Sequence, residues 1–478
     1  MKNKFDVIVI GAGAGGLNIA GFMNTAGFKV LLIDKSDENI GGDCLNTGCI
    51  PSKSLLHFSK TKHFYKDANF DIKQATDYIK DKQNIIREHE NAEYFRNKGI
   101  TVVFGEAKFA DRNSVVVGDE IYTSKKIVLA TGSKPRYINI PGIENVNIFN
   151  NENIFNISYL PKKLIIIGGG PIGVELGQAF NNLGSNVTIL THRFLHKEDK
   201  EVVSILRKKL EGEGIKIYTN IKIEKIVKSK CSDFESGKIA EIIYTDEKEV
   251  ENKIETDAVL FSAGRTLNIK NLDLEKAGIE LENVETELDE NKKLKIDNKF
   301  RTTNKNVVAI GDVAGNFMFT HAAELHASVI INNYFSPFKK KFNGDKMSWV
   351  TYTSPEIATF GLSENELKKR NIKHKILRKN LSEDDRSIVD ENDGLLKVFV
   401  SPKGKVLGGT MVSKNAGELI QELILLNSED MKIDVLANKI YPYPTATRIN
   451  RSIALSFLSE KLTPKTKKVL KFLFKILG

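Results

Sequence analysis

Short apolar runs, each ending in a glycine turn, recur along the chain and predict a set of buried strands. The first run, residues 5–10, is rich in β-branched side chains and leads into the glycine-rich stretch 11–16. An apolar pattern with helical spacing covers residues 17–25, and a second apolar run occupies residues 30–33. This order predicts a strand, a turn, a helix and a strand, which is typical of an α/β fold with a parallel sheet.

The glycines of the first turn have the spacing of a dinucleotide-binding motif. Gly11 would permit the tight turn, Gly13 would let a pyrophosphate approach the backbone, and Gly16 would let the helix pack closely on the strand. The helix N-terminus would then offer unpaired N–H groups to the phosphates. Asp34 closes the second strand, where a carboxylate would bind ribose hydroxyls. We therefore expect a dinucleotide site here.

The same pattern returns between residues 164 and 190 and predicts a second dinucleotide site. An apolar run precedes a turn in which Gly168, Gly170 and Gly173 repeat the glycine spacing, and a helix and another strand follow. The chain is therefore expected to contain two units of this kind.

The second unit keeps the glycines and loses the acid. Thr191 stands at the offset that Asp34 has in the first unit, and His192 and Arg193 follow it, with Lys197 nearby. A missing carboxylate beside positive side chains favours a nucleotide with a 2′-phosphate. We expect NADPH, with NADH as the alternative if these are ordinary surface residues.

Further apolar runs end at residues that are candidate ligand contacts, because α/β sheets bind ligands at the carboxyl ends of their strands. These residues are Thr131, Gly132, Gly264, Arg265, Gly311 and Asp312. Asp312 is a candidate partner for a ribityl or ribose hydroxyl, and its alternative role is that of a turn residue or helix cap.

Residues 41–51, GGDCLNTGCIP, hold two of the three cysteines in the chain. Cys44 and Cys49 are too far apart for a disulfide in an undistorted helix, because bridged Cα atoms usually lie within about 7 Å. The flanking glycines, Gly42 among them, allow irregular backbone. A zinc site would need further Cys or His ligands. The spacing therefore favours a redox pair, and we expect Cys231, in a polar stretch, to be functionally silent.

Composition narrows the class of protein. A length of 478 residues with 41% apolar residues favours several domains with sizeable cores. The net charge of +10 fits an anionic ligand, a membrane surface, nucleic acid or simply a lysine-rich solvated surface. Basic residues are not interleaved with aromatics, so no nucleic-acid partner is expected. The low cysteine content excludes a disulfide scaffold and favours a reducing, cytoplasmic compartment.

The apolar runs are too short for membrane spans, since none approaches about 18 uninterrupted apolar residues. The N-terminus has basic residues and a short apolar run, but this run enters a glycine turn and no small-residue cleavage site follows. We therefore expect a strand there and not a signal peptide.

Taken together, the two dinucleotide motifs, the segment GGDCLNTGCIPSK and the segment AIGDVAG resemble the class I pyridine nucleotide–disulfide oxidoreductases. The resemblance covers essentially the whole chain, in order. It implies an α/β fold with two Rossmann-like dinucleotide-binding domains and a C-terminal α+β dimerisation domain. The implied segments are 1–149 and 269–346 for the FAD-binding and central domain, 150–268 for the NAD(P)H-binding domain, and 347–478 for the dimerisation domain.

The resemblance also implies cofactors, partners and roles. It places FAD in the first site and a nicotinamide nucleotide in the second, and it implies a homodimer. Cys49 would form a charge-transfer thiolate against the flavin, and Cys44 would exchange with substrate. Lys53 would lie near the flavin with Glu175 as its ion-pair partner, so that an ammonium stabilises negative charge on the reduced flavin. Gly42 is expected among the cofactor contacts.

One C-terminal segment, YPYPTATRIN, departs from the family pattern. Disulfide-reducing members carry a His-Pro-Thr segment followed by a Glu, and here Tyr443 and Arg448 stand at the His and Glu positions. A phenol, with a usual pKa of about 10, is a poor proton shuttle near neutrality. The segment resembles the mercuric-reductase-like branch, and thiolate-plus-phenol sites suit soft metal ions. The vicinal cysteines of mercuric reductases are missing from this tail, which argues against mercury as the native substrate.

The tail, residues 461–478, contains six lysines and no acid among large apolar residues. Lys468, Lys471 and Lys475 fall on one helical face. Two interpretations stay open: a helix bound peripherally to the inner face of an anionic membrane, or an apolar face docked on the dimer.

The leading hypothesis is an FAD-dependent NADPH oxidoreductase. Electrons would pass via FAD to the Cys44–Cys49 disulfide and on to an unidentified metal ion, quinone or small disulfide. One alternative is a dihydrolipoamide dehydrogenase-like enzyme using NAD, against which Thr191, Tyr443 and Arg448 argue. The other is a flavin-binding redox sensor with little turnover.

Overall fold

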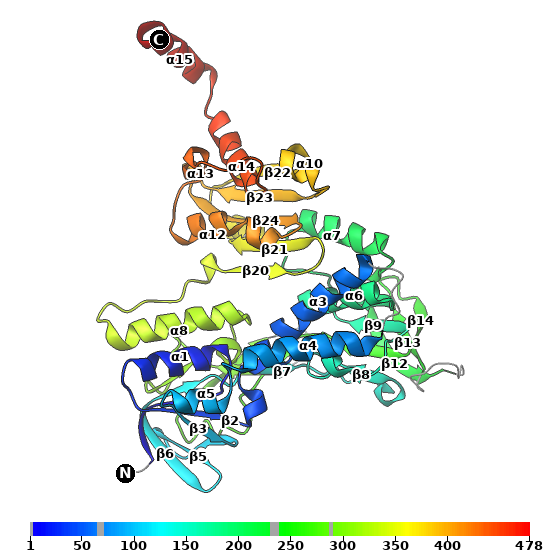
Figure 1. Ribbon diagram of the computed structural model, residues 1–478, viewed down its shortest axis with the longest axis vertical. Coiled ribbons are helices and arrows are strands. Elements are labelled where there is room, and N and C mark those ends of the chain that lie inside the picture. Colours follow the sequence, from blue (N-terminus) through cyan, green and yellow to red (C-terminus); the bar gives the residue numbers. More distant parts are fainter. Residues whose placement is uncertain (1–2, 65–70, 230–238, 286–289) are drawn as a thin grey trace. The chain divides into compact units, whose positions relative to one another are not determined.

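The computed structural model describes residues 3–64, 71–229, 239–285 and 290–478 (Figure 1). The chain divides into two compact units, and each unit takes two segments of the chain. The first unit consists of Met1–Phe194 and Gly214–Phe342, and the second consists of Leu195–Glu213 and Asn343–Gly478. Cys231 lies outside the described residues.

A seven-stranded sheet carries the first glycine motif. Its strands, in sheet order, are β3 (Thr101–Phe104), β2 (Val30–Asp34), β1 (Lys4–Ile10), β6 (Glu120–Leu129), β5 (Ser114–Val117) and β4 (Ala107–Phe109), and β19 (Val307–Ala309) also pairs with β6. β1, β2, β3, β6 and β19 pair in parallel, whereas β4 and β5 are antiparallel. The predicted strand, turn, helix and strand are confirmed as β1, α1 (Ala14–Thr25) and β2.

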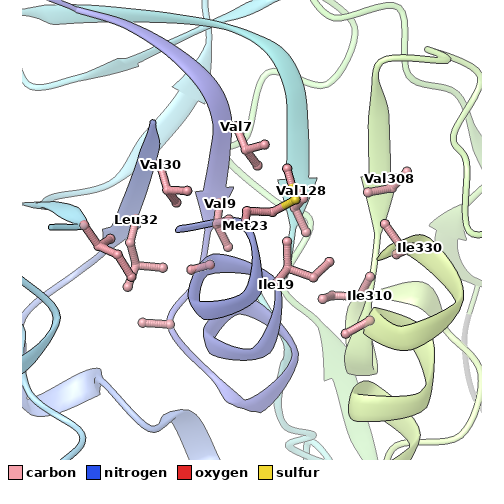
Figure 2. Packing of buried hydrophobic residues seen from close by; sticks show 14 of the residues in the cluster. Val7, Val9, Ile19, Met23, Val30, Leu32, Val128, Val308, Ile310 and Ile330 are labelled. Carbon is pink, nitrogen blue, oxygen red and sulfur yellow. The ribbon is translucent and has the colours of Figure 1, made fainter. Parts of the chain in front are cut away.

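The core of this domain lies on both faces of the sheet. Val7 and Val9 of β1 face α1, where Ile19 and Met23 pack against them (Figure 2). The alternate residues of β1 point to the opposite face and belong to a second buried cluster. Burial on both faces is typical of parallel strands and explains the continuous apolar run in the sequence. Helix α8 (Thr320–Phe335) packs beside α1 (Figure 1).

Within the described part of the chain, four helices follow the first βαβ unit in the sequence. They are α2 (Gly42–Asn46), α3 (Cys49–Phe64), α4 (Ile72–Arg87) and α5 (Ala92–Asn97). α3 packs against both α4 and α6 (Pro171–Leu183), and α6 is the helix that follows the second glycine turn (Figure 1). α3 therefore joins the parts of the chain that carry the two motifs.

The second glycine motif lies on a five-stranded parallel sheet. Its strands, in order, are β11 (Lys216–Tyr218), β10 (Asn186–Leu190), β9 (Lys163–Ile167), β15 (Ala258–Phe261) and β8 (Asn147–Phe149). An antiparallel sheet of β12 (Lys222–Lys228), β13 (Ala240–Thr245) and β14 (Glu251–Thr256) shares a buried cluster with it. Two further ribbons pair β7 (Ser133–Pro135) with β16 (Arg265–Leu267), and β17 (Leu281–Glu285) with β18 (Glu290–Leu294).

The second unit is built on an antiparallel sheet, which confirms the predicted C-terminal α+β domain. Its strands, in order, are β20 (Ser348–Thr351), β21 (Glu356–Gly361), β24 (Val406–Ser413), β23 (Leu395–Val400) and β22 (Lys375–Asn380). Its later helices are α9 (Glu364–Lys369), α10 (Asp385–Val389), α11 (Ala416–Leu419), α12 (Gln421–Ser428), α13 (Val435–Asn438), α14 (Arg448–Ser459) and α15 (Pro464–Leu477).

Helix α7 (Lys200–Gly212) belongs to the second unit although it follows β10 in the sequence. It packs on β21 and β24. The buried ammonium of Lys397 contacts Asp199 Oδ2 at 2.7 Å and Glu201 Oε2 at 3.0 Å. Trp349 Nε1 donates to Glu198 Oε1 at 2.6 Å. These contacts anchor α7 to the second unit, although in the sequence it falls within the expected segment 150–268. The boundaries of that segment stay a prediction.

No helix within the described ranges is both long and apolar enough to cross a bilayer.

Two glycines of α1 give a matched test of the close helix–strand packing. A Cβ at Gly16 would overlap the carbonyl oxygen of Gly11, whereas a Cβ at Gly21 would have no neighbour within 4 Å. We expect Gly16→Ala to destabilise the fold by about 1–3 kcal/mol. Gly21→Ala should stabilise it by about 0.5–1 kcal/mol, because alanine loses less backbone entropy. The urea midpoints of the two variants provide the measurement, and equal midpoints would contradict the packing argument.

Candidate active site

The first glycine turn has the geometry that a pyrophosphate needs. Gly11 has φ +107°, in the left-handed region, and its Cβ would overlap the carbonyl oxygen of Ala130. Gly13 precedes α1 without any side-chain capping bond, and the first turn of α1 contains no acidic residue. The helix N-terminus therefore keeps its backbone donors and its positive dipole end for an anion. This arrangement fits the phosphates of a dinucleotide.

Asp34 lies at the carboxyl end of β2, beside the same turn. Its Oδ2 accepts the backbone N–H of Ala12 at 2.6 Å, and its Oδ1 accepts that of Lys35 at 2.6 Å. Burial raises the pKa of Asp34, and these hydrogen bonds oppose the shift. The carboxylate is thus held at the turn, where the sequence places a ribose contact.

The second glycine turn repeats this geometry. Gly168 has φ +121°, and its Cβ would come within 2.5 Å of Ser262 O. A Cβ at Gly173 would overlap Ser262 Oγ, whereas Gly170, before α6, has no atom within 4 Å of its Cβ position. Pro171 begins α6 without a capping side chain. At Gly170, the open position, a ligand is expected to approach the backbone closely. The crowded positions, Gly168 and Gly173, need glycine for the turn itself.

The residues after β10 lie at the carboxyl end of the second sheet. Thr191 is buried, and its hydroxyl donates to Arg193 O at 2.9 Å. His192 and Arg193 are exposed. Lys197 belongs to the second unit.

The cysteine segment is divided between two helices, α2 and α3. Cys44 lies in α2 and Cys49 is the first residue of α3. Gly42 has φ +60°, and its Cβ would lie 2.7 Å from the Cα of Gly13. A Cβ at Gly48 would lie 2.6 Å from Asp43 O. Glycine is therefore required on both sides of Cys44, and the first glycine turn directly contacts the cysteine segment.

The two thiols differ in their electrostatics. Cys44 is half-buried and Cys49 is exposed. The hydrogen bond from the Cys44 thiol, the charge of Lys53 and the Thr320 hydroxyl, 3.7 Å from Cys49 Sγ, lower the pKa of Cys49 to about 6. The same hydrogen bond and burial raise the pKa of Cys44. In the reduced pair the thiolate therefore resides on Cys49 and the proton on Cys44.

Lys53 and Glu175 connect α3 with α6. The Lys53 ammonium lies 2.7 Å from Glu175 Oε2, and the Glu175 side chain is only 6% exposed. A buried carboxylate is stable as an anion only beside a cation. This ion pair therefore holds the Lys53 charge close to Cys49, where it contributes to the low pKa of the thiol.

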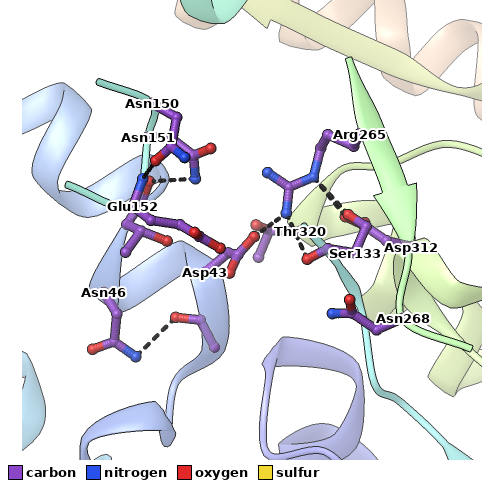
Figure 3. Close-up of polar contacts among 12 residues, drawn as sticks. Asp43, Asn46, Ser133, Asn150, Asn151, Glu152, Arg265, Asn268, Asp312 and Thr320 are labelled. Atoms are coloured by element: carbon purple, nitrogen blue, oxygen red, sulfur yellow. Dashed lines mark hydrogen bonds and ion pairs between the residues drawn. The ribbon is translucent and has the colours of Figure 1, made fainter. Parts of the chain in front are cut away.

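Arg265 links three parts of the first unit (Figure 3). Its guanidinium donates to Ser133 Oγ at 2.5 Å, lies 3.5 Å from Asp312 Oδ2 and forms an ion pair with Asp43, the neighbour of Cys44. Ser133 Oγ donates to Asp312 Oδ2 at 2.5 Å. Burial raises the pKa of Asp312, against the effects of Ser133 and Arg265. Gly264, with φ +107°, precedes the arginine.

The other predicted turn residues are held by backbone contacts. Thr131 Oγ1 donates to Asn268 O at 2.8 Å, Asn268 Nδ2 donates to Thr131 O at 2.9 Å, and Asn268 N donates to Gly132 O at 3.1 Å. Gly311 N donates to Nδ1 of the buried His326 at 3.2 Å. These bonds hold the turn after β6 to Asn268 and the turn after β19 to α8.

Tyr443 lies in the second unit, whereas the cysteine pair lies in the first. Tyr443 is 67% exposed, and its hydroxyl donates to Asp385 Oδ2 at 3.3 Å. The Arg448 guanidinium lies 5.1 Å from the centre of the Tyr443 ring. The two residues that depart from the family pattern thus form one surface cluster.

Sequence reasoning missed Asp43, Ser133, Asn268 and Thr320. Asp43 directly precedes Cys44, so its position in the sequence alone could have indicated a place in the site. Thr320 opens α8, 271 positions from Cys49, and no local pattern indicates that contact. Within the described ranges, no group of three or more His, Cys, Asp or Glu side chains could hold a metal ion.

Comparisons with known proteins agree with this geometry. Residues 5–327 match the pyridine nucleotide-disulphide oxidoreductase family model, and residues 347–452 match the dimerisation domain of the same family. A dihydrolipoyl dehydrogenase from Buchnera aphidicola is 32% identical, with 98% of this chain and 99% of that protein covered. A mercuric reductase from Lysinibacillus sphaericus is 30% identical, with 95% and 83% covered.

Among solved structures, the Cu(II) complex of the HOCl-induced flavoprotein disulfide reductase RclA from Escherichia coli matches with a TM-score of 0.81. It is 25% identical and covers 95% of this chain and 99% of its own. The chain therefore belongs to the class I pyridine nucleotide-disulphide oxidoreductases, a family of enzymes that use FAD and NAD(P)H.

Proposed function

We propose that this protein is an FAD-dependent NADPH oxidoreductase. Electrons from NADPH would pass via FAD to a Cys44–Cys49 disulfide and then to a metal ion, a quinone or a small disulfide. The observation that carries the proposal is the asymmetric thiol pair beside the Lys53–Glu175 ion pair. FAD, when bound, supplies the redox chemistry between a nicotinamide and a disulfide.

The chain offers two sets of residues for the two nucleotides. The first turn, with its left-handed glycine and uncapped helix, fits the FAD pyrophosphate, and Asp34 and Asp312 would bind hydroxyls of the same cofactor. The residues proposed to hold FAD are Gly11, Gly13, Gly16, Asp34, Gly42, Thr131, Gly132, Gly311 and Asp312. Those proposed to hold or border the nicotinamide nucleotide are Gly168, Gly170, Gly173, His192, Arg193, Gly264 and Arg265.

The cysteine chemistry follows from the different proton affinities of the two thiols. Reduction of the disulfide takes up two electrons and one proton, which together equal the hydride that NADPH supplies, and leaves a thiolate on Cys49 and a thiol on Cys44 at neutral pH. Attack by Cys44 on an external disulfide requires removal of its proton, and the hydrogen bond to Cys49, burial and the charge of Cys49 all make this harder. With Tyr443 in place of histidine, such attack lacks its usual base. This favours acceptors such as metal ions or quinones over ordinary disulfides.

NADPH is the proposed electron donor. Thr191 replaces the ribose-binding acid, and the exposed side chains of His192 and Arg193 lie at the same strand end. A guanidinium can form bidentate hydrogen bonds with a phosphate, which favours a 2′-phosphate over a free hydroxyl.

The proposed assembly is a cytoplasmic homodimer. The match of residues 347–452 to the dimerisation domain supports the homodimer. In this proposal Tyr443, which is well exposed in the single chain, would serve the cysteine pair of the partner copy.

Two alternatives have specific support. The dihydrolipoyl dehydrogenase relatives favour a related activity with NAD, but Thr191, Tyr443 and Arg448 argue against it. The missing His–Glu pair favours a flavin-binding sensor with little turnover.

For the leading proposal, the Cu(II) complex of RclA supports copper ions as one acceptor to test.

The thiolate of Cys49 gives the first test. We expect anaerobic NADPH titration of the FAD-loaded protein to produce a long-wavelength thiolate–flavin band. Because the pKa of Cys49 is lowered to about 6, the band should persist above this pH and fade as the pH falls through it. Lys53→Met should move the midpoint upward, whereas Lys60→Met, about two turns further along α3, should not.

The rate of iodoacetamide alkylation of Cys49 in the Cys44→Ser variant should show the same pH profile without flavin chemistry, since serine keeps a hydrogen-bond donor. Absence of the band with both cysteines intact would refute the proposed electron path.

Arg193 tests the nucleotide. We expect Arg193→Ala to lower kcat/KM for NADPH by about 10–100-fold, because a charge-assisted hydrogen bond contributes about 1.5–3 kcal/mol. The kcat/KM for NADH should stay unchanged and serves as the internal control. Equal losses with both nucleotides would show that Arg193 does not contact a 2′-phosphate.

Tyr443 tests the acceptor. We expect the wild-type protein, screened with copper ions, quinones and small disulfides, to oxidise NADPH fastest with a metal ion or a quinone. Tyr443→His combined with Arg448→Glu should raise disulfide reduction by up to about 10²–10⁴-fold, since it restores acid–base assistance. Tyr443→Phe is the control for loss of the hydroxyl alone. If no acceptor other than oxygen supports turnover, the sensor alternative holds.

A further inference from the structure

The chain ends in an amphipathic helix with an exposed apolar face. α15 begins at Pro464, and the hydroxyl of Thr463 caps it by accepting the N–H of Thr466 at 3.2 Å. None of its residues is buried, and its large apolar side chains are between 42% exposed, at Leu473, and 80% exposed, at Leu477. The helix is the last, red element in Figure 1. This amphipathic helix thus has no described partner within the chain.

The apolar side chains cover one continuous side of α15. At about 100° per residue they span an arc of about 200°. They are Val469, Leu470, Phe472, Leu473, Phe474, Ile476 and Leu477. Lys468, Lys471 and Lys475 lie together on the opposite face, and Lys467 borders it. The helix therefore separates a wide apolar face from a face of lysines.

The charge of the helix has one sign only. Residues 461–478 contain six lysines and no acidic residue. Among the described residues, the lysines of α15 form no ion pair, although many lysines elsewhere in the chain do. Their charge is therefore left for a negatively charged partner.

The helix also lies beyond the residues that the dimerisation-domain model matches. The dimerisation-domain match ends at residue 452, within α14, and α15 follows after a short turn. The matched domains therefore assign no role to α15.

We propose that α15 binds the surface of an anionic lipid bilayer. Its apolar face enters the interface between headgroups and acyl chains, and its lysines contact the phosphate groups. A helix of this length, about 21 Å, lies along the surface, since a span needs about 30 Å of hydrocarbon to be crossed. Lys465, at the edge of the apolar face, reaches the headgroups because its long aliphatic stem is flexible.

An anionic surface fits the helix better than a second copy of the chain. The flanks of the apolar face carry only lysines, and the protein as a whole has a net charge of +10. A like-charged partner chain would repel this face, whereas a negatively charged surface attracts it at every lysine.

Cosedimentation of the full-length, FAD-loaded protein with vesicles tests the proposal. One set of vesicles contains phosphatidylcholine alone, and the other adds phosphatidylglycerol. We expect at least about tenfold tighter binding to the anionic vesicles, weakened by salt. Leu473→Glu, which places a charge in the middle of the apolar face, should abolish binding.

Two lysine triple variants separate local charge from net charge. K468Q/K471Q/K475Q should weaken binding to anionic vesicles by about 100-fold. K248Q/K253Q/K403Q, at exposed positions elsewhere, lowers the net charge by the same three units and should leave binding unchanged. Flavin content and NADPH oxidation in solution should be unchanged in every variant, so a failure of the membrane proposal is distinguishable from a failure of the proposed function.

Three results would overturn the proposal. One is no cosedimentation of the intact protein with anionic vesicles. A second is binding that Leu473→Glu leaves intact. A third is an absence of vesicle binding together with a change in oligomeric state on Leu473→Glu, which would assign the apolar face to a second copy of the chain.

Discussion

The site depends first on the position of α3, the helix that begins at Cys49. Its ion pair from Lys53 to the buried Glu175 joins it to α6, and the close approach of Gly42 to Gly13 joins the segment before it to the first glycine turn. A buried carboxylate without its cation would carry a large desolvation cost. The contact that stabilises the packing of α3 on α6 is thus also the contact that places positive charge near a thiol.

This arrangement gives the two cysteines opposite tendencies. Cys49 begins a helix, and both the hydrogen bond from Cys44 and the charge of Lys53 favour its thiolate. The same hydrogen bond, together with burial, raises the pKa of Cys44. One thiol therefore favours the thiolate form, while the other favours the protonated form.

Local patterns predicted the parts of the fold that depend on neighbouring residues. The strands, the glycine turns and the first helix were readable because apolar runs and glycine positions act within a few residues. The contacts of Arg265 with Asp43 and Asp312 could not be predicted in this way, because Arg265 and Asp43 are 222 positions apart and only the folded chain brings them together. The place of α7 was equally hidden, because its amphipathic pattern shows that it packs but not on which sheet.

That place of α7 has a consequence for how the protein can be divided. The chain leaves the first unit after Phe194, returns at Gly214 and leaves again after Phe342, so three peptide connections join the two units. One proteolytic cut cannot release either unit. A fragment that ends before the C-terminal sheet would keep α7 without β21 and β24 and would expose its apolar side. A fragment of the C-terminal sheet alone would leave the buried ammonium of Lys397 without Asp199 and Glu201. The two units pack separately, but neither can be produced as one continuous segment of the chain.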